Sequence, residues 1–132
     1  TMGNLVKKTT LTVRDQILAF APPEAPYMAI GIQVNTSAAG SDGIVKAGTP
    51  MAGNIETVAA AFTKAATTGD PGSEVNDAVG ILLHDVKPAD DANGTLLIFG
   101  AVNLNRLDTD VQALIDEHAK KALDGKIWFL KR

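Results

Sequence analysis

Three apolar segments punctuated by glycine constrain the fold of this chain more than any other feature. They are 43–50 (GIVKAGTP), 78–86 (AVGILLHDV) and 96–104 (LLIFGAVNL). Such β-branched runs are typical of buried strands, in which a glycine marks a bulge or a close approach of another backbone. None of the three carries a nucleophile, a metal-ligand cluster or a phosphate-binding loop. The segments therefore indicate a structural building block rather than a catalyst.

Composition limits the partners that this chain is expected to bind. Its 132 residues suit one domain, and 45% apolar with 20% charged residues is typical of a globular protein. The net charge of −3 and the scattered basic residues argue against a nucleic-acid partner, which needs a concentrated basic surface. The chain has no cysteine, so disulfides and thiolate metal sites are excluded. No run reaches the ~20 apolar residues of a membrane helix, so we expect no membrane partner.

Residues 1–26 are expected to form an N-terminal arm or linker that leads into a single domain at 27–132. Within the arm, 9–13 (TTLTV) has strand composition, with Leu11 and Val13 on one side. The three prolines between 22 and 26 remove backbone donors and end any regular element.

The first part of the domain is expected to alternate strands and loops. Every second residue of 28–34 is apolar, so these side chains share one face, which predicts a half-buried strand. Residues 51–66 fit a helix capped by Asn54, but 58–63 also fits a strand, and both remain open. Residues 67–73 are expected to be an exposed loop.

The second part of the domain is expected to hold a hairpin, a helix and a final strand. Asn93-Gly94 predicts the tight turn between the second and third segments. Apolar residues at steps of three and four predict one helix over 107–123, capped by Asp108 or Thr109 and stopped at Gly125. Residues 126–130 predict a strand. The fold class is therefore α+β, a small and mostly antiparallel β domain with one helix in its C-terminal region.

The sequence predicts no catalytic, cofactor or metal residues. His84 and Asp85 are neighbours on a strand, so their side chains point to opposite faces. His118 lies on the apolar side of the expected helix, and no spacing joins the two histidines in a metal site. We therefore expect no enzyme and no cofactor. A small hydrolase that uses His84 or His118 with an acidic partner remains an alternative.

The order of the segments resembles the head fibre and head decoration proteins of tailed bacteriophages. The resemblance covers 44–130 and rests on "IVKAGTPM", then "AVGILLHDV", then "LLIFGAVNLNRL", followed by a helix and a short strand. It implies a decoration-like fold and a structural virion protein without catalytic residues. Such proteins attach to the outside of an assembled capsid, commonly as trimers, as head decoration or as the base of a head fibre.

The resemblance also implies the partners and the location of the chain. The partners are the major capsid protein and further copies of the chain, most simply in a homotrimer. The protein would be made in the bacterial host cytoplasm and reside on the capsid exterior. We expect a strand of the arm to add to an exposed sheet edge of the shell protein. The residues of this capsid contact are Thr9, Thr10, Leu11, Thr12 and Val13.

One further function class remains open. A carbohydrate- or ligand-binding surface module without catalysis would need exposed aromatic side chains. Tyr27 and Trp128 are the two candidates in this sequence.

Overall fold

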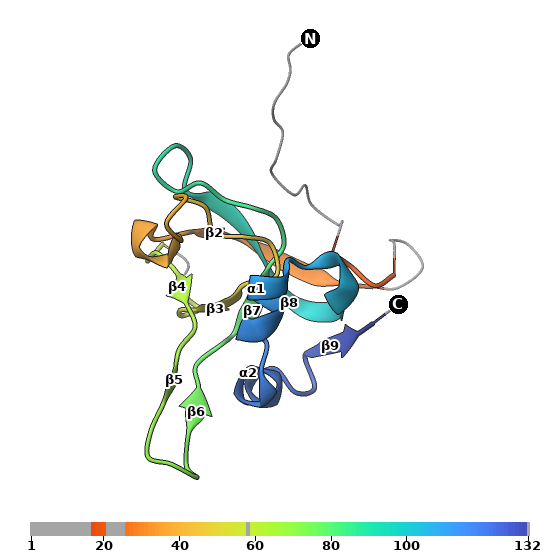
Figure 1. Ribbon diagram of the computed structural model, residues 1–132. Helices are drawn as coiled ribbons and strands as arrows, with labels where there is room; N and C mark the ends of the chain where they lie inside the picture. The colour runs from red at the N-terminus through yellow and green to blue at the C-terminus, as the bar shows by residue number, and fades with distance from the viewer. Residues whose placement is uncertain (1–16, 21–25, 58, 132) are drawn as a thin grey trace.

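The computed structural model describes residues 17–20, 26–57 and 59–131. A mostly antiparallel sheet of six strands and two short helices make up the fold, which confirms the α+β class (Figure 1). The strand order is β2-β8-β7-β3-β4, and β9 also pairs with β8. The strands are β2 (Met28–Gln33), β3 (Pro50–Ala52), β4 (Thr63–Lys64), β7 (Gly80–Leu82), β8 (Asn93–Asn103) and β9 (Ile127–Leu130).

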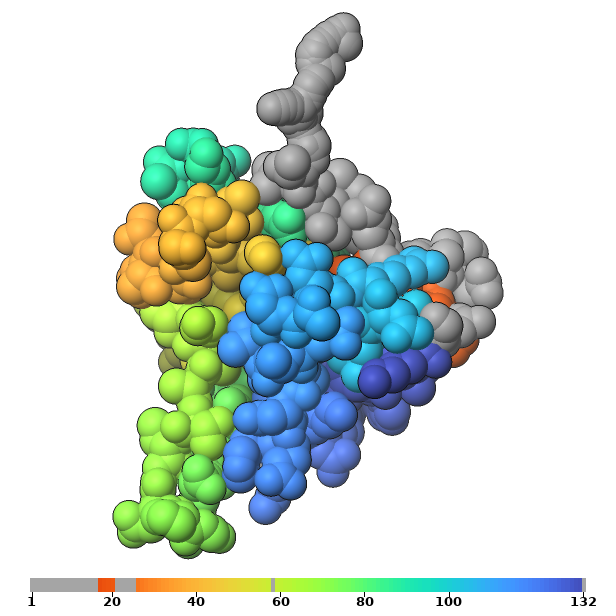
Figure 2. All heavy atoms as spheres, viewed as in Figure 1, coloured from red at the N-terminus to blue at the C-terminus, as the bar shows by residue number. Residues whose placement is uncertain are grey.

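Smaller elements surround this sheet. They are the two-stranded hairpin β5 (Thr67–Thr68) and β6 (Val75–Asn76), the helices α1 (Thr109–Leu114) and α2 (Glu117–Ala122), and the 3-10 turns η1 (Thr36–Ala38) and η2 (Leu104–Arg106). The hairpin β5–β6 projects from the body of the molecule in Figure 2, where it is yellow-green. In the part of the chain that the structure describes, no helix is long and apolar enough to cross a membrane.

The three glycine-punctuated segments lie side by side in the fold. The second and third pair as antiparallel strands, with Leu82 opposite Leu96. The first borders the second, because Val45 and Val86 form a bridge and the Leu82 amide donates to the carbonyl oxygen of Thr49 at 3.0 Å. One continuous β layer is therefore built from segments far apart in the sequence.

The β7–β8 ladder is buried on both of its faces. Ile81 and Leu97 pack into a cluster that includes Val111 of α1 and that Ala122 of α2 packs against. Leu82 and Leu96 pack into a second cluster beside β2. All four of these Ile and Leu side chains have an exposed fraction of 0%. Burial on both sides explains why this part of the sequence is a continuous apolar run rather than an alternating one.

β8 is the strand that joins the rest of the fold together. Six of its first seven residues pair with β2, with a bulge that leaves out Ile98, and its last four pair in parallel with β9. Leu18 forms an antiparallel bridge with Val102 of β8, and both side chains are buried. The chain is therefore already part of the core at Ile17–Ala19, although this stretch lies within the arm expected at 1–26. Most of that arm is outside the described residues.

Two local predictions differ from the observed structure. The helix alternative for residues 51–66 is wrong, because β3 ends at Ala52 and the Asn54 side chain then accepts the Glu56 amide in a turn. The strand alternative for 58–63 also differs from the structure, in which Phe62 forms an isolated bridge with Val34 and β4 begins only at Thr63. Asn93-Gly94 is not the hairpin turn but the start of β8, opposite Gln33 and Ile32. A Cβ at Gly94 would lie 3.0 Å from Cγ2 of Val34, so a larger residue there would have to displace this side chain.

The predicted single helix is also wrong, because the structure has two helices separated at Ile115 and Asp116. The Asp116 carboxylate accepts the amides of His118 and Ala119 and so caps a new helix at this position. Two other predictions are confirmed: Gly125 adopts a φ of +79° after α2, and β9 follows directly. The strand at 28–34 is likewise confirmed as β2. The loop expected at 67–73 instead contains β5 and the turn of the projecting hairpin.

Candidate functional site

An exposed apolar face on the β8–β9 ladder is the strongest candidate for a functional surface. Ala101 lies opposite Trp128 in the parallel pairing of these strands. Because side chains alternate along a strand, Phe99 and Ala101 of β8 share this face with Trp128 and Leu130 of β9. The Phe99 and Trp128 rings meet edge to face, with centroids 5.4 Å apart and planes at 80°.

The other side of the same ladder belongs to the core. Val102 and Ile127 are 0% and 4% exposed, whereas Phe99 and Trp128 are 37% and 49% exposed. The exposed side is a shallow hollow of about 350 Å³ without a charged side chain in its lining. Its side chains are those of Phe20, Pro26, Phe99, Ala101, Trp128 and Leu130. An uncharged apolar surface of this kind is typical of an interaction site. We call it the β8–β9 face.

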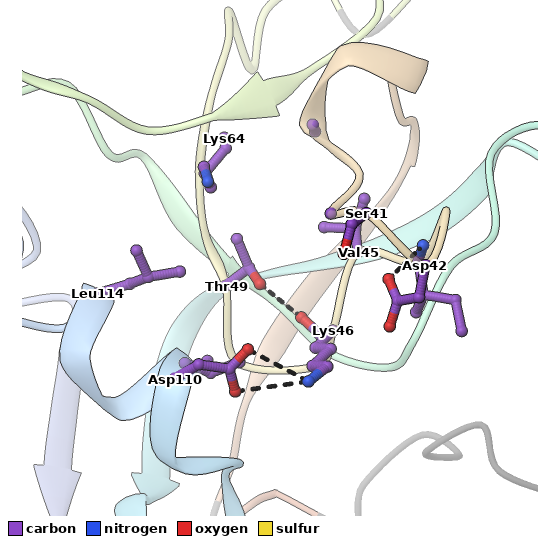
Figure 3. Close-up of a pocket in the computed structure, with 12 residues that line it drawn as sticks. Ser41, Asp42, Val45, Lys46, Thr49, Lys64, Asp110 and Leu114 are labelled. Atoms are coloured by element: carbon purple, nitrogen blue, oxygen red, sulfur yellow. Dashed lines mark hydrogen bonds and ion pairs between the residues drawn. The ribbon is translucent and has the colours of Figure 1, made fainter.

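A second hollow, of about 220 Å³, lies between the first glycine-punctuated segment and α1 (Figure 3). The Lys46 ammonium lies 3.2 Å from carboxylate oxygens of both Asp108 and Asp110. The hydrogen bonds to Asp110 and Asp108 raise the pKa of Lys46, and the bond from Lys46 lowers the pKa of Asp110. Thr49 donates its hydroxyl to the Lys46 carbonyl oxygen at 2.6 Å. These contacts connect the loop that holds Lys46 to the start of α1, so we assign them a structural role.

His84 is held between a loop and β8. Its Nδ1 lies 3.0 Å from the carbonyl oxygen of Asp85, and its Nε2 lies 3.2 Å from Oγ1 of Thr95. The Asp85 carboxylate accepts the amide of Ala47 at 2.7 Å. The acidic neighbour of His84 in the sequence therefore supports the backbone of the first segment.

His118 lies in a different part of the fold, on α2. Its Nε2 is 3.8 Å from a carboxylate oxygen of Glu74, near the start of β6, and 3.9 Å from one of Glu117. No group of three or more metal-ligating side chains occurs among residues 17–20, 26–57 and 59–131. The hydrolase that would use His84 or His118 stays a prediction.

The two aromatic candidates from the sequence lie in different surroundings. Tyr27 is half-buried against the core, and a Cβ on Gly100 would lie 3.2 Å from the Tyr27 Cβ. Trp128 is exposed, and its aromatic neighbour is Phe99. Sequence reasoning missed Phe99, because only the pairing of β8 with β9 brings the two rings together.

The predicted capsid contact at residues 9–13 lies outside the described residues. No family model matches the chain, and no curated protein shows a significant match to it.

Proposed function

We propose that this chain is a structural virion protein that binds the outer surface of a tailed-phage capsid, as head decoration or as the base of a head fibre. One observation carries the proposal: the three segments on which the resemblance rests form one continuous β layer, joined at Val45–Val86 and Leu82–Leu96. Their order in the sequence therefore reflects one folded unit rather than scattered similarities. A protein that binds only the assembled shell stabilises that shell by mass action.

The proposal includes specific partners. These are the major capsid protein and further copies of this chain, in a homotrimer. The strand-like segment 9–13 would add to a sheet edge of the shell protein, with backbone hydrogen bonds supplying much of the affinity. The protein would act without catalysis or a cofactor, on the capsid exterior, after synthesis in the host cytoplasm.

Co-sedimentation with expanded and unexpanded heads of the encoding phage tests this function. We expect the full chain to pellet with expanded heads and to saturate at a fixed ratio to the shell protein. Failure of the full chain to bind either kind of head contradicts the proposed function. Light scattering on the free protein should give the mass of three 13.7 kDa chains; a monomer would contradict the trimer.

A deletion variant tests the capsid contact separately. Removing residues 2–14 leaves Ile17 and Leu18, which are 1% and 3% exposed, in the core. We expect this variant to keep the circular dichroism spectrum of the full chain but to lose capsid binding. Undiminished binding would contradict the role of residues 9–13 and leave the capsid function standing.

The exposed Phe99–Trp128 pair supports a second candidate function, a carbohydrate- or ligand-binding surface module. Aromatic rings on an open surface supply large apolar contact areas, and the indole of Trp128 adds one hydrogen-bond donor. Retention on immobilised host-cell polysaccharide that is lost in Trp128→Ala would support this function. If neither the full chain nor the variant is retained, this candidate is wrong.

A further inference from the structure

We propose that residues 9–13 of the N-terminal segment cover the β8–β9 face of their own chain in the free protein. The inference goes beyond capsid binding, because it concerns how the protein is arranged before it meets any partner. Three features of the described residues and of the sequence support it: the size of the face, the place where the chain enters the fold, and the chemistry of the segment.

The size of the face fits one short strand better than another folded protein. Phe20, Phe99 and Trp128 are 36%, 37% and 49% exposed. With 150–250 Å² for each aromatic side chain, they present about 200–300 Å² together. A stable protein–protein interface needs about 800 Å² from each partner. Five residues in a strand span about 16 Å, against about 13 Å for the four residues of β9.

The chain enters the described fold at one end of this face. The Asn103 amide donates to the carbonyl oxygen of Ile17 at 2.8 Å, and the Ala19 amide donates to that of Ala101 at 3.0 Å. Asn103 is opposite Leu130 in the β8–β9 pairing, so Ile17 lies at the Leu130 end of the face. Only residues 14–16 separate Val13 from Ile17, a reach of at most about 14 Å.

This short tether favours binding within one chain. A segment attached a few residues from its site has an effective concentration on the order of millimolar. A second molecule would have to compete with that concentration to occupy the same face.

The chemistry of the segment matches an uncharged aromatic face. In a strand, Leu11 and Val13 share one side and Thr10 and Thr12 share the other. The apolar pair would pack on the rings of Phe99 and Trp128 while the threonines face water. Residues 1–16 also carry three basic side chains and one acidic, whereas the rest of the chain has nine basic and fourteen acidic. Opposite net charges favour contact between the segment and the body.

Trp128 provides the test, because it is the only tryptophan in the chain. Two double variants add equal charge to opposite sides of the segment: Leu11→Asp with Val13→Asp, and Thr10→Asp with Thr12→Asp. We expect the first to shift the emission of Trp128 to longer wavelength and to raise its acrylamide quenching constant about two-fold, as water gains access to the ring. The threonine variant should stay close to the unmodified chain, because its charges face water and only the weak, salt-screened attraction between segment and body is lost.

The deletion of residues 2–14 should reproduce the emission of the variant with both Leu11→Asp and Val13→Asp. Circular dichroism and melting temperature confirm that each variant is folded. Equal quenching in the two double variants, or unchanged quenching in the deletion, overturns the proposal. The proposal is also overturned if Trp128 becomes protected from acrylamide only at protein concentrations at which the molecular mass of the particle increases. A second copy of the chain would then be the cover. Capsid binding plays no part in these measurements, so either proposal can fail without the other.

Discussion

Gly48 shows how a single residue position can depend on glycine for two reasons. Its φ is +94°, and a Cβ would lie 2.5 Å from Cδ2 of Leu107. Its amide also donates to the carbonyl oxygen of Leu82 at 2.7 Å, so the backbone cannot move away without losing a bond to β7. The glycine in this segment therefore reflects close packing against the chain that precedes α1.

We expect Gly48→Ala to lower the free energy of unfolding by about 2–4 kcal/mol, since it combines left-handed strain with overpacking. Gly43→Ala is the matched control: its φ is +78°, but nothing lies within 4 Å of the added Cβ. Gly43→Ala should lower the free energy of unfolding by about 1–2 kcal/mol, because it adds left-handed strain without overpacking. Urea unfolding of both variants measures the difference, and equal losses would show that contact with Leu107 is unimportant.

The ion pairs of Lys46 predict a pH dependence of stability. The pKa of Asp110 is lowered from 3.8 in the folded protein. Its contribution to the free energy of unfolding is therefore fully present above pH 3.8 and is lost as the pH falls through the lower pKa of the folded state. The pKa of Lys46 is raised from 10.5, so its contribution is present below pH 10.5 and is lost as the pH rises through its higher folded value. The exposed position of the pair keeps the effect small.

We therefore expect Lys46→Met to lower the melting temperature slightly at pH 7 in low salt. Thermal melts across pH should show this difference shrinking in strong acid and in high salt, where Asp110 is protonated or screened. Lys64→Met, which removes a lysine from the same hollow, is the control. A difference that persists unchanged at high salt would assign the effect to lost side-chain packing.

At the scale of elements, the break between α1 and α2 results from one capping residue. The Asp116 carboxylate accepts two amides at 3.0 Å, from His118 and Ala119. Asp108, at the corresponding position of α1, makes no side-chain cap bond, and its carboxylate pairs with Lys46 instead. The apolar spacing continues across both helices, so the pattern of burial alone does not reveal the break.

We expect Asp116→Ala to lower the free energy of unfolding by about 1 kcal/mol, the usual cost of losing an N-cap. Asp116→Asn should retain most of the stability, because its amide oxygen can accept the same two bonds. Chemical denaturation compares the unmodified chain with both variants. If Asp116→Asn were as destabilising as Asp116→Ala, the charge of Asp116 rather than its cap geometry would be the stabilising feature.

Elements with strong local signals were predictable, and those that depend on partners were not. β2, β9 and the stop at Gly125 follow from alternation, an apolar run and a left-handed glycine. Asn93-Gly94 has the composition of a turn, but its pairing with Gln33 and Ile32 places it in a strand. That pairing is a contact between distant parts of the chain, which no local window contains.

At the scale of the whole molecule, the β7–β8 ladder links two hydrophobic clusters. Leu82 packs into the cluster beside β2, and Leu83 packs into the cluster with the helices; both are 0% exposed. Two adjacent residues thus support opposite sides of one sheet. A substitution that destabilises either cluster should therefore also destabilise the other, because both clusters pack on the same strands.

We expect Leu82→Ala and Leu83→Ala each to cost about 2–5 kcal/mol, as is usual for fully buried leucines. Each variant should still unfold in a single transition, with fluorescence of Trp128 and circular dichroism coinciding. In calorimetry, each variant should likewise show one unfolding peak, with equal calorimetric and van't Hoff enthalpies. Two separated transitions in either variant would show that the clusters unfold independently.

By itself, the sequence determined the α+β class, the apolar segments that become the central layer, and the absence of cysteine chemistry. Composition, alternation and glycine placement are local properties that need no knowledge of partners. Only the tertiary structure decided that β9 runs parallel to β8 and that Phe99 and Trp128 share one exposed face. The run 127–130 is apolar on both sides, so nothing local distinguishes its buried side chains from its exposed ones. That distinction comes from which face of the ladder the core covers.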